Sequence, residues 1–305
     1  MAGESKKRRS KPSETLDKDA GEFALTPRLN WSFLKKTPPG PGVYRIYGSQ
    51  SLLIYVGKAK NLRRRLSQYK NVKRRRKHRR MGRIIQEAER IEFESCDSEL
   101  AAELQEVQLI QSHRPKWNIV SAFYFLYPML GLKWEGKSQD HLLFCYTTHP
   151  ENYPDFLFHG AYRSREITQE AFFAIVKLLK YVGHPMGSVK ERRSRHSYLY
   201  GFRNLSEEWM NLWSEFLKGH SRQVLEVLIL SLVENAGARE ERSEIQELLE
   251  KIKRFWNHEA IPLYRARTHT GFSSFPVSQL ERDQVFIRYR HLAADVKHEK
   301  LIISN

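Results

Sequence analysis

Hydrophobic and polar residues alternate in two short segments that follow a turn rich in proline and glycine. Val43–Tyr47 and Leu52–Val56 show this alternation, and residues 48–51 between them are one glycine and three polar residues. A period of two predicts strands, and a short polar connection predicts an antiparallel hairpin. A third strand is predicted at Ile91–Cys96.

Apolar residues at helical spacing predict three helices around this hairpin. The first follows Asn61, the second covers Arg79–Arg90, and the third begins at Asp97 or Ser98 and ends before Pro115. The order is therefore strand, strand, helix, helix, strand, helix. Within roughly 80 residues, this order predicts a compact α+β module with a three-stranded sheet.

The second half of the chain is predicted to be mainly helical. His141–Thr147 has the pattern of a strand and Thr168–Tyr181 that of a helix, and three more helices are predicted to start at Ser206, Ser221 and Ser243. The Trp and Phe residues of the helix that follows Ser206 lie on one face, which we interpret as core. From Ile261 onward no strong pattern is present.

These patterns predict six segments. They are a disordered basic tail at 1–27, a compact α+β domain at 28–120, a small α/β segment at 121–183, a basic linker at 184–204, a helical region at 205–260 and a C-terminal extension at 261–305.

Positive charge is unevenly distributed along the chain. The chain has 52 Lys and Arg against 35 Asp and Glu, and Lys58–Arg83 holds 14 Lys or Arg in 26 residues without one Asp or Glu. Because like charges this dense repel each other, we expect phosphates to bind there rather than water alone, without reading of base sequence. The expected nucleic-acid contacts are Lys60, Arg63, Arg64, Lys73, Arg74, Arg75, Arg76, Lys77, Arg79, Arg80 and Arg83.

Cysteine content and hydropathy exclude several other classes. The two cysteines, Cys96 and Cys145, cannot make a disulfide framework, and they cannot supply four thiolates for a zinc site or an iron–sulfur cluster. They are typical of a reducing cytosol. No signal-peptide pattern is present, and the longest apolar stretch, 119–132, is shorter than the about 20 residues of a membrane span. We therefore expect a cytoplasmic protein without zinc, iron–sulfur cluster or membrane contact.

Five motifs occur in order around the basic run. They are Gly42-Val43-Tyr44; Tyr55-Val56-Gly57 ten residues later; Lys58-Ala59-Lys60-Asn61-Leu62 with Arg65 and Tyr69; the helix Ser98–Glu106; and Arg114-Pro115-Lys116-Trp117-Asn118. This set resembles the GIY-YIG endonucleases, and in detail the UvrC and Cho-like family of nucleotide excision repair nucleases.

The resemblance assigns a role to each residue of a predicted active site. It implies one Mg²⁺ or Mn²⁺ ion bound by Glu106, Tyr44 as general base, Tyr55 as the residue that orients water or phosphate, and Arg65 as the clamp on the scissile phosphate. A phenol has a pKa near 10, so nearby cations would have to favour the phenolate. The remaining site residues are Lys58, Tyr69 and Asn118.

The residues alone leave the metal ligand open. Glu99, Glu103 and Glu106 are spaced by four and three along one predicted helix, so any of them could project on a shared face. One carboxylate is enough to anchor Mg²⁺, which keeps most of its waters. Without the resemblance, Glu103 and Glu106 are equal candidates. Only the family-like spacing to Asn118 favours Glu106.

Beyond residue 118 the resemblance is fainter. Segments 127–130 and 158–164 are similar to the family's second region, but the four cysteines that hold its iron–sulfur cluster are absent and its UvrB-binding motif is degenerate at 236–252. The resemblance implies an endonuclease that nicks damaged duplex DNA on the 3′ side of the lesion, with UvrB as a candidate partner. Two alternatives are a DNA-binding scaffold with a vestigial site and a nuclease of foreign or mobile DNA.

Overall fold

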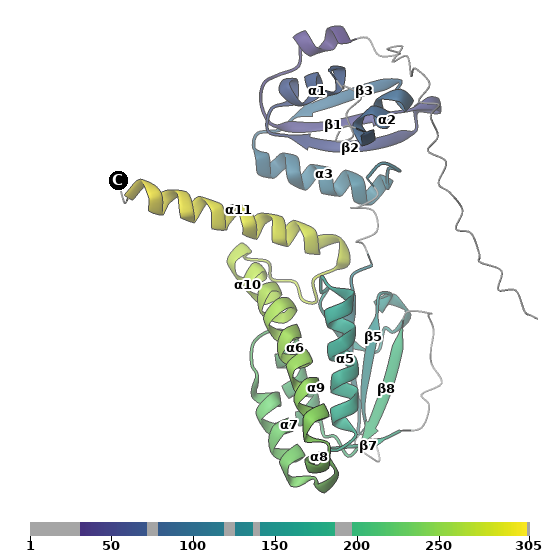
Figure 1. Cartoon of the computed structure of the whole chain (residues 1–305), viewed down its shortest axis with the longest axis vertical. Helices are drawn as coiled ribbons and strands as arrows, with labels where there is room; N and C mark the ends of the chain where they lie inside the picture. The colour runs from purple at the N-terminus through teal and green to yellow at the C-terminus, as the bar shows by residue number, and fades with distance from the viewer. Residues whose placement is uncertain (1–30, 72–78, 119–125, 137–140, 187–196, 304–305) are drawn as a thin grey trace, which may run out of the picture.

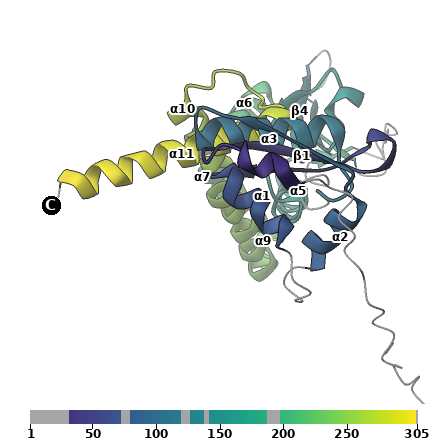
Figure 2. The same cartoon turned by 90° about the horizontal axis from the view of Figure 1, so that it is seen from above.

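The computed structural model describes residues 31–71, 79–118, 126–136, 141–186 and 197–303. Figure 1 shows a smaller unit built on a three-stranded sheet above a larger body built on a five-stranded sheet. The last helix, α11 (Gln279–Ile303), passes between the two units and then projects away from them, as Figure 2 shows from above. The architecture is α+β, which confirms the sequence prediction.

The smaller unit contains the predicted hairpin and third strand. Its strands are β1 (Gly42–Tyr47), β2 (Leu53–Ala59) and β3 (Arg90–Ser95), in the order β2-β1-β3 and all antiparallel. The chain turns from β1 to β2 through a short 3-10 segment, η2 (Ser49–Ser51). In this register Tyr44 lies opposite Gly57, and Ile46 lies opposite Tyr55.

Three helices and a short 3-10 segment surround this sheet: α1 (Leu62–Lys70), α2 (Arg79–Glu87), α3 (Glu99–His113) and η1 (Trp31–Lys35). Two of them start at the side-chain caps that the sequence indicates. The Asn61 side chain accepts a hydrogen bond from the Arg64 N–H, and the Ser98 side chain accepts one from the Ala101 N–H. α3 ends at Arg114, which has left-handed backbone angles.

Helix α2 is shorter than predicted. It ends at Glu87 rather than Arg90, because the Glu89 N–H donates to the Tyr47 carbonyl oxygen at 2.8 Å and starts the pairing of β3 with β1. A hydrogen bond to a strand therefore ends the helical pattern that the side chains alone would continue.

The sheet of the smaller unit is covered on both faces. Successive strand residues point to opposite faces, so Tyr44 and Ile46 pack against α1 and α2, while Val43 and Val56 pack against α3. The candidate tyrosines on β1 and α1 consequently lie on the α1 side, between the sheet and the helix.

The larger body is built on the sheet β6-β4-β5-β8-β7. Its strands are β4 (Met129–Glu135), β5 (His141–Thr147), β6 (Leu157–His159), β7 (His184–Pro185) and β8 (Tyr198–Arg203). Residues 184–204 were expected to be a basic linker, and this expectation is wrong for β7 and β8. β8 hydrogen-bonds to β5 over its whole length, and Phe202 is buried. Its Tyr and Phe residues pair with a neighbouring strand that lies about 50 positions earlier, which local sequence does not reveal.

Helices pack on one face of this sheet. They are α5 (Arg165–Leu179), α6 (Glu207–Leu217), α7 (Gln223–Glu234), α8 (Ala236–Glu240), α9 (Arg242–Phe255) and α10 (Ile261–Thr270), with a π-helical segment η5 (Trp256–Ala260) between the last two and a 3-10 turn η4 (Pro150–Asn152) after β5. Trp213 and Phe216 of α6 are fully buried. The interpretation of that aromatic stripe as core is confirmed.

The segment beyond residue 261 is part of the same body rather than a separate extension. Val277 exchanges two backbone hydrogen bonds with Gly160 and Ala161, both of 2.9 Å, and Val285 of α11 is buried in the core. α11 contacts the body with one side and α3 with another. Its contacts are therefore spread around the helix, which explains why its sequence shows no single apolar stripe.

Several expectations fall outside the described residues. These are the 1–27 tail, the domain boundary near 120 and the densest part of the basic run at 73–77. Among the helices that the structure describes, none combines the length and the apolar character that a membrane crossing requires.

Candidate active site

Two hairpin tyrosines approach each other above a glycine. Tyr44 on β1 and Tyr55 on β2 have ring centres 6.0 Å apart, and Gly57 lies directly opposite Tyr44. A Cβ atom on Gly57 would lie 2.5 Å from Tyr44 Oη and 2.9 Å from Tyr55 Cε1, closer than side chains tolerate. The glycine of the second triplet is thus required because both rings fill the space that its side chain would occupy.

Helix α1 adds a second layer to the two tyrosines. Arg65 Nε donates to Tyr44 Oη at 3.1 Å, and the hydroxyls of Tyr44 and Tyr69 are 3.1 Å apart. Arg65 also donates to Gln68 at 3.0 Å, and its guanidinium carbon lies 5.5 Å from the ring centre of Tyr69. The structure therefore brings Tyr44, Arg65 and Tyr69 into one hydrogen-bonded group.

The environment of Tyr44 keeps its hydroxyl protonated in this state. Burial raises the pKa of Tyr44 well above its usual value, and the neighbouring Tyr69 and Tyr55 add to the effect. The Arg65 charge acts in the opposite direction but does not overcome burial. From the sequence, nearby cations are expected to favour the phenolate. In the protein alone, the loss of water around the phenol outweighs the one guanidinium that contacts it.

Glu106 lies on α3, on the other side of β2. Its Oε1 accepts a hydrogen bond of 3.0 Å from the Lys58 N–H, while Oε2 has no hydrogen-bond partner among the described residues. Partial burial raises the pKa of Glu106, and Lys58 opposes this rise. A half-buried carboxylate with one unpaired oxygen is suited to hold a cation.

The described ranges hold no group of three or more His, Cys, Asp or Glu side chains arranged for a metal. A site that relies on several protein ligands is therefore not present in them. The donor set around Glu106 does fit Mg²⁺, because this ion retains several waters and often takes only one or two carboxylates.

Glu103, the second candidate ligand, is occupied by cations. Its Oε1 is 2.7 Å from Lys58 Nζ and 2.5 Å from Arg290 Nη2, and its Oε2 is 3.0 Å from His291 Nε2. Burial alone would raise the pKa of Glu103, but hydrogen bonds from Lys58 and His291 with the charges of Lys58 and Arg290 outweigh it and lower the pKa to about 2. Glu106 is therefore the carboxylate with free ligand capacity.

Asn118 lies against the backbone of β2 rather than in an open pocket. Its Oδ1 accepts from the Val56 N–H at 2.9 Å, and its Nδ2 donates to the Val56 carbonyl at 2.8 Å. Val56 stands between Tyr55 and Gly57, so the buried Asn118 fixes the strand that carries both. From the sequence, this side chain is expected to complete the pocket. Instead, both the oxygen and the nitrogen of its amide bond to β2, the strand that carries Tyr55 and Gly57.

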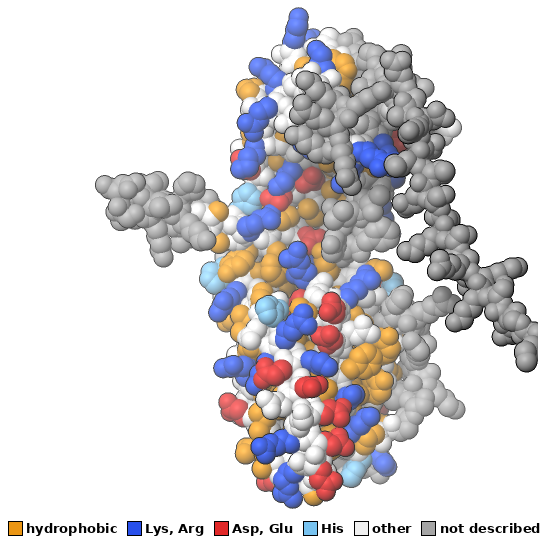
Figure 3. All heavy atoms as spheres, viewed as in Figure 1, with side chains coloured by type: hydrophobic (Ala, Val, Ile, Leu, Met, Phe, Trp, Pro, Cys, Tyr) orange, Lys and Arg blue, Asp and Glu red, His pale blue; other side chains and the backbone are white. Residues whose placement is uncertain are grey.

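The predicted nucleic-acid contacts differ in their exposure and in whether they already bond to another residue. Arg64, Arg79 and Arg83 are exposed. Lys60 pairs with Glu99 at 2.7 Å, and Arg63 Nε donates to the Thr37 carbonyl at 2.7 Å. On the face shown in Figure 3, basic side chains predominate on the smaller unit, whereas acidic and basic side chains are mixed over the larger body.

The Arg80 side chain makes contacts within the smaller unit. It donates to the Trp117 carbonyl, and its guanidinium lies 5.9 Å from the ring centre of Tyr55. Five of the expected contacts, Lys73, Arg74, Arg75, Arg76 and Lys77, lie outside the described residues.

Sequence reasoning missed the contribution of α11 to this region. Arg290 and His291 contact Glu103 across 187 and 188 positions of the chain. Neither belongs to a motif, and the segment around them shows no strong periodicity, so no sequence signal indicated the contact.

The smaller unit thus carries two tyrosines that face each other across a hairpin, an arginine on the next helix and a carboxylate with one oxygen free among the described residues. A family model described as the UvrC-like GIY-YIG domain matches residues 40–119. These residues are a GIY-YIG domain of the UvrC-like family.

Relatives of this chain include proteins named UvrABC system protein C. The one from Cytophaga hutchinsonii is 42% identical over 103 residues, which are 33% of this chain and 17% of the relative. The one from Shewanella sp. (strain ANA-3) is 28% identical over 241 residues, 73% of this chain and 38% of the relative. The chain thus covers well under two thirds of the length of either protein.

Solved structures of one domain also match. The GIY-YIG N-terminal endonuclease domain of UvrC from Thermotoga maritima, bound to its catalytic magnesium, is 35% identical to this chain. The match covers 28% of this chain and 91% of that domain, with a TM-score of 0.26.

Proposed function

We propose that this protein is a metal-dependent endonuclease that nicks one strand of duplex DNA. The observation that carries the proposal is the pairing of two features in the family-matching segment. One is the hydrogen-bonded group of Tyr44, Arg65 and Tyr69 above Gly57. The other is Glu106, whose second carboxylate oxygen is free among the described residues.

Each side chain has a role that its position supports. Glu106 would hold the cation, and Arg65, which has donors beyond its bond to Tyr44, would grip the scissile phosphate. Tyr44 is the proposed general base and Tyr55 the residue that orients water or phosphate. Lys58 would add positive charge to the site, with its ammonium group paired to Glu103 at 2.7 Å. Asn118 keeps the β2 wall in place.

A divalent cation at Glu106 would supply a Lewis acid for the phosphate oxygens and a positive charge that opposes the effect of burial on Tyr44. The magnesium reported for the Thermotoga maritima domain supports Mg²⁺ as the ion. Mn²⁺ is the second candidate, because it accepts the same oxygen ligands.

The names of the relatives support a place in nucleotide excision repair. We propose incision on the 3′ side of a lesion, leaving 5′-phosphate and 3′-hydroxyl ends, with UvrB as a candidate partner. A chromosomal DNA substrate implies that the reaction takes place in the cytoplasm. The basic surface of the smaller unit supplies the sequence-independent grip on the duplex.

A nicking assay with a damaged and an undamaged plasmid tests the function. Supercoiled DNA of both kinds is incubated with the protein and Mg²⁺, Mn²⁺ or a chelator, and relaxed circles are counted. We expect metal-dependent nicking that is faster on damaged DNA. Equal rates on both plasmids would favour a nuclease of foreign DNA. No nicking with either metal would leave a DNA-binding scaffold as the better assignment.

A further inference from the structure

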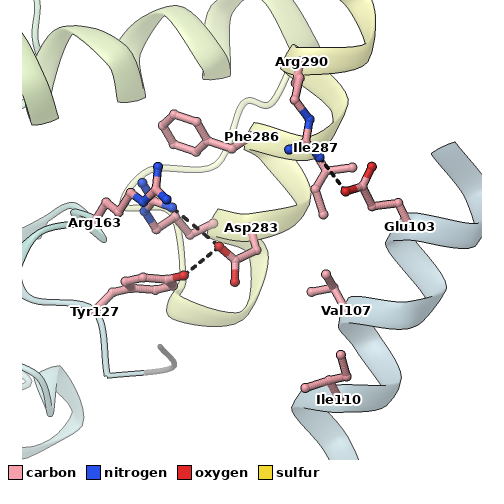
Figure 4. Close-up of a pocket in the computed structure, with 10 residues that line it drawn as sticks. Glu103, Val107, Ile110, Tyr127, Arg163, Asp283, Phe286, Ile287 and Arg290 are labelled. Atoms are coloured by element: carbon pink, nitrogen blue, oxygen red, sulfur yellow. Dashed lines mark hydrogen bonds and ion pairs between the residues drawn. The ribbon is translucent and has the colours of Figure 1, made fainter. Parts of the chain in front are cut away.

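Helix α11 contacts α3, the helix of the smaller unit that carries Glu103 and Glu106. Figure 4 shows Arg290 directed from α11 toward Glu103 on α3, above a pocket of about 290 Å³ whose apolar walls include Val107 of α3 and Ile287 of α11. His291 makes a second contact with the same carboxylate. An arginine and a histidine of the C-terminal helix therefore hold one acidic residue of the smaller unit.

The same carboxylate holds Lys58. The Glu103–Lys58 pair has an N–O distance of 2.7 Å, and the Glu103 side chain is only 13% exposed whereas that of Lys58 is 40% exposed. A long lysine side chain at the surface has many rotamers, and fixing it in one of them requires a well-placed partner. Glu103 is that partner, because it is itself fixed by Arg290 and His291.

Lys58 is in this way attached to α3 at two points. Its backbone N–H donates to Glu106, the proposed metal ligand, and its ammonium group pairs with Glu103 one helical turn earlier. A change in the position of Glu103 would move the Lys58 ammonium while leaving the backbone contact to Glu106 in place.

We propose that α11 positions the Lys58 ammonium group of the active site through Glu103, so that the C-terminal helix is a working part of the nuclease site. The catalytic consequence rests on the proposed endonuclease function. The positioning itself does not, and it can be measured without DNA.

The ionic contacts are separable from the docking of α11 on α3. Gln111 of α3 donates to the Leu280 carbonyl at 3.3 Å, and apolar residues of both helices line the pocket between them. These contacts remain when Arg290 and His291 are replaced by glutamine. Substitutions at the two positions therefore change the support of Glu103 without removing the other contacts between the helices.

The first measurement is the reactivity of Lys58. The full-length protein is treated at fixed pH with a limiting amine-acylating reagent, and acylation at Lys58 is followed by mass spectrometry, with the more exposed Lys60 as internal reference. We expect Arg290→Gln combined with His291→Gln to raise Lys58 reactivity several-fold, and we expect the same of Glu103→Gln alone. Arg290→Lys in an otherwise wild-type chain should preserve the protection.

The matched control is Arg288→Gln. Arg288 is an exposed cation of the same helix that makes no side-chain hydrogen bond or ion pair among the described residues. Its replacement should leave Lys58 reactivity at the wild-type level. If Lys58 reacts faster in Glu103→Gln but not in the α11 double variant, α11 has no part in the positioning. If neither changes it, the whole inference fails.

The second measurement is a double-mutant cycle on nicking. The α11 double variant and Glu103→Gln should each lower kcat about tenfold, the reduction expected for one charge-assisted contact, with little change in DNA affinity. Combined, they should lower it no further, because both act on Lys58 through one path. Additive reductions with a lower unfolding midpoint would show that α11 acts only by holding the units together.

The two measurements separate the failure of the inference from the failure of the function. If Lys58 is acylated faster in the variants but the wild type never nicks DNA, the positioning is supported and the proposed function is refuted. If the wild type and the variants nick DNA equally well and Lys58 acylation is unchanged in the variants, the function is supported and the positioning is refuted.

Discussion

The two units of this protein use their buried volume in different ways. In the smaller unit the interior of the sheet holds hydroxyl, guanidinium and amide groups, from Tyr44 and Tyr69, Arg65 and Asn118. In the larger body a cluster of aliphatic and aromatic side chains around Trp213 and Phe216 forms most of the interior, and hydrogen bonds between its buried polar side chains lie outside the candidate site. Most buried polar groups need hydrogen-bond partners, so the candidate site of the smaller unit depends on geometry, whereas the larger body depends mainly on apolar area.

Glu106→Ala should have the largest effect on the chemistry of the smaller unit. Removing the carboxylate removes the proposed cation site, which is worth several kcal/mol in the transition state, so nicking should fall on the order of a thousandfold. DNA affinity should hold or rise slightly, because a negative charge leaves a basic surface. Gel shifts and plasmid nicking check both. Wild-type nicking by Glu106→Ala would refute the metal assignment. Glu103→Gln is the matched carboxylate control, and it should lower nicking only about tenfold.

Trp213→Ala should have the largest effect on stability in the larger body. The ring is fully buried, and the cavity should lower the free energy of unfolding by about 3–5 kcal/mol. Denaturant unfolding followed by circular dichroism measures it. Trp209→Ala on the same helix, where the side chain is only partly buried, should cost less. Equal reductions would mean that the two tryptophan positions do not differ in burial as the structure indicates.

Gly57→Ala tests the dependence of the smaller unit on geometry. One methyl group would press on Tyr44 and Tyr55, so we expect a decrease of about 1–3 kcal/mol in stability together with a marked decrease in nicking. Gly40→Ala is the control, since a Cβ there meets nothing within 4 Å. A Gly57→Ala protein that is as active and stable as the wild type would show that the rings can move apart freely.

Replacing Arg74, Arg75, Arg76 and Lys77 with Gln should have the smallest effect on folding and a graded effect on binding. Each lysine or arginine that no longer neutralises a phosphate reduces the slope of log affinity against log salt by about 0.9. The decrease in affinity should be alike for all duplexes, because phosphates carry no sequence information. Titrations at several salt concentrations check it, and an unchanged slope would mean that the run is only a solvated surface.

Sequence alone was sufficient where short-range patterns determine the structure. The hairpin follows from alternation and a polar turn, and the starts of α1 and α3 follow from capping side chains at Asn61 and Ser98. Because Tyr44 and Tyr55 are placed by one hairpin, and Arg65 and Tyr69 by the next helix, most of the candidate site could be predicted from residues close in the chain.

Sequence was insufficient where a residue's contacts lie far away in the chain or where burial determines its protonation state. The choice between Glu103 and Glu106 depends on Arg290, 187 positions away. The protonated state of Tyr44 depends on how closely α1 covers the sheet. Strand β8 was missed because its pairing partner lies in another segment. Tertiary contacts override local pattern in each of these places.

The contact between Asn118 and Val56 also protects this protein against self-association. β2 is an edge strand, and an edge with free N–H and C=O groups can pair with another chain and seed aggregates. The Asn118 amide occupies both groups of Val56, and the Trp117 N–H donates to the Ile54 carbonyl at 3.0 Å. The last residues of the motif thus close the open edge of the sheet. Asn118→Ala would leave Val56 unpaired there, so self-association should accompany any decrease in activity.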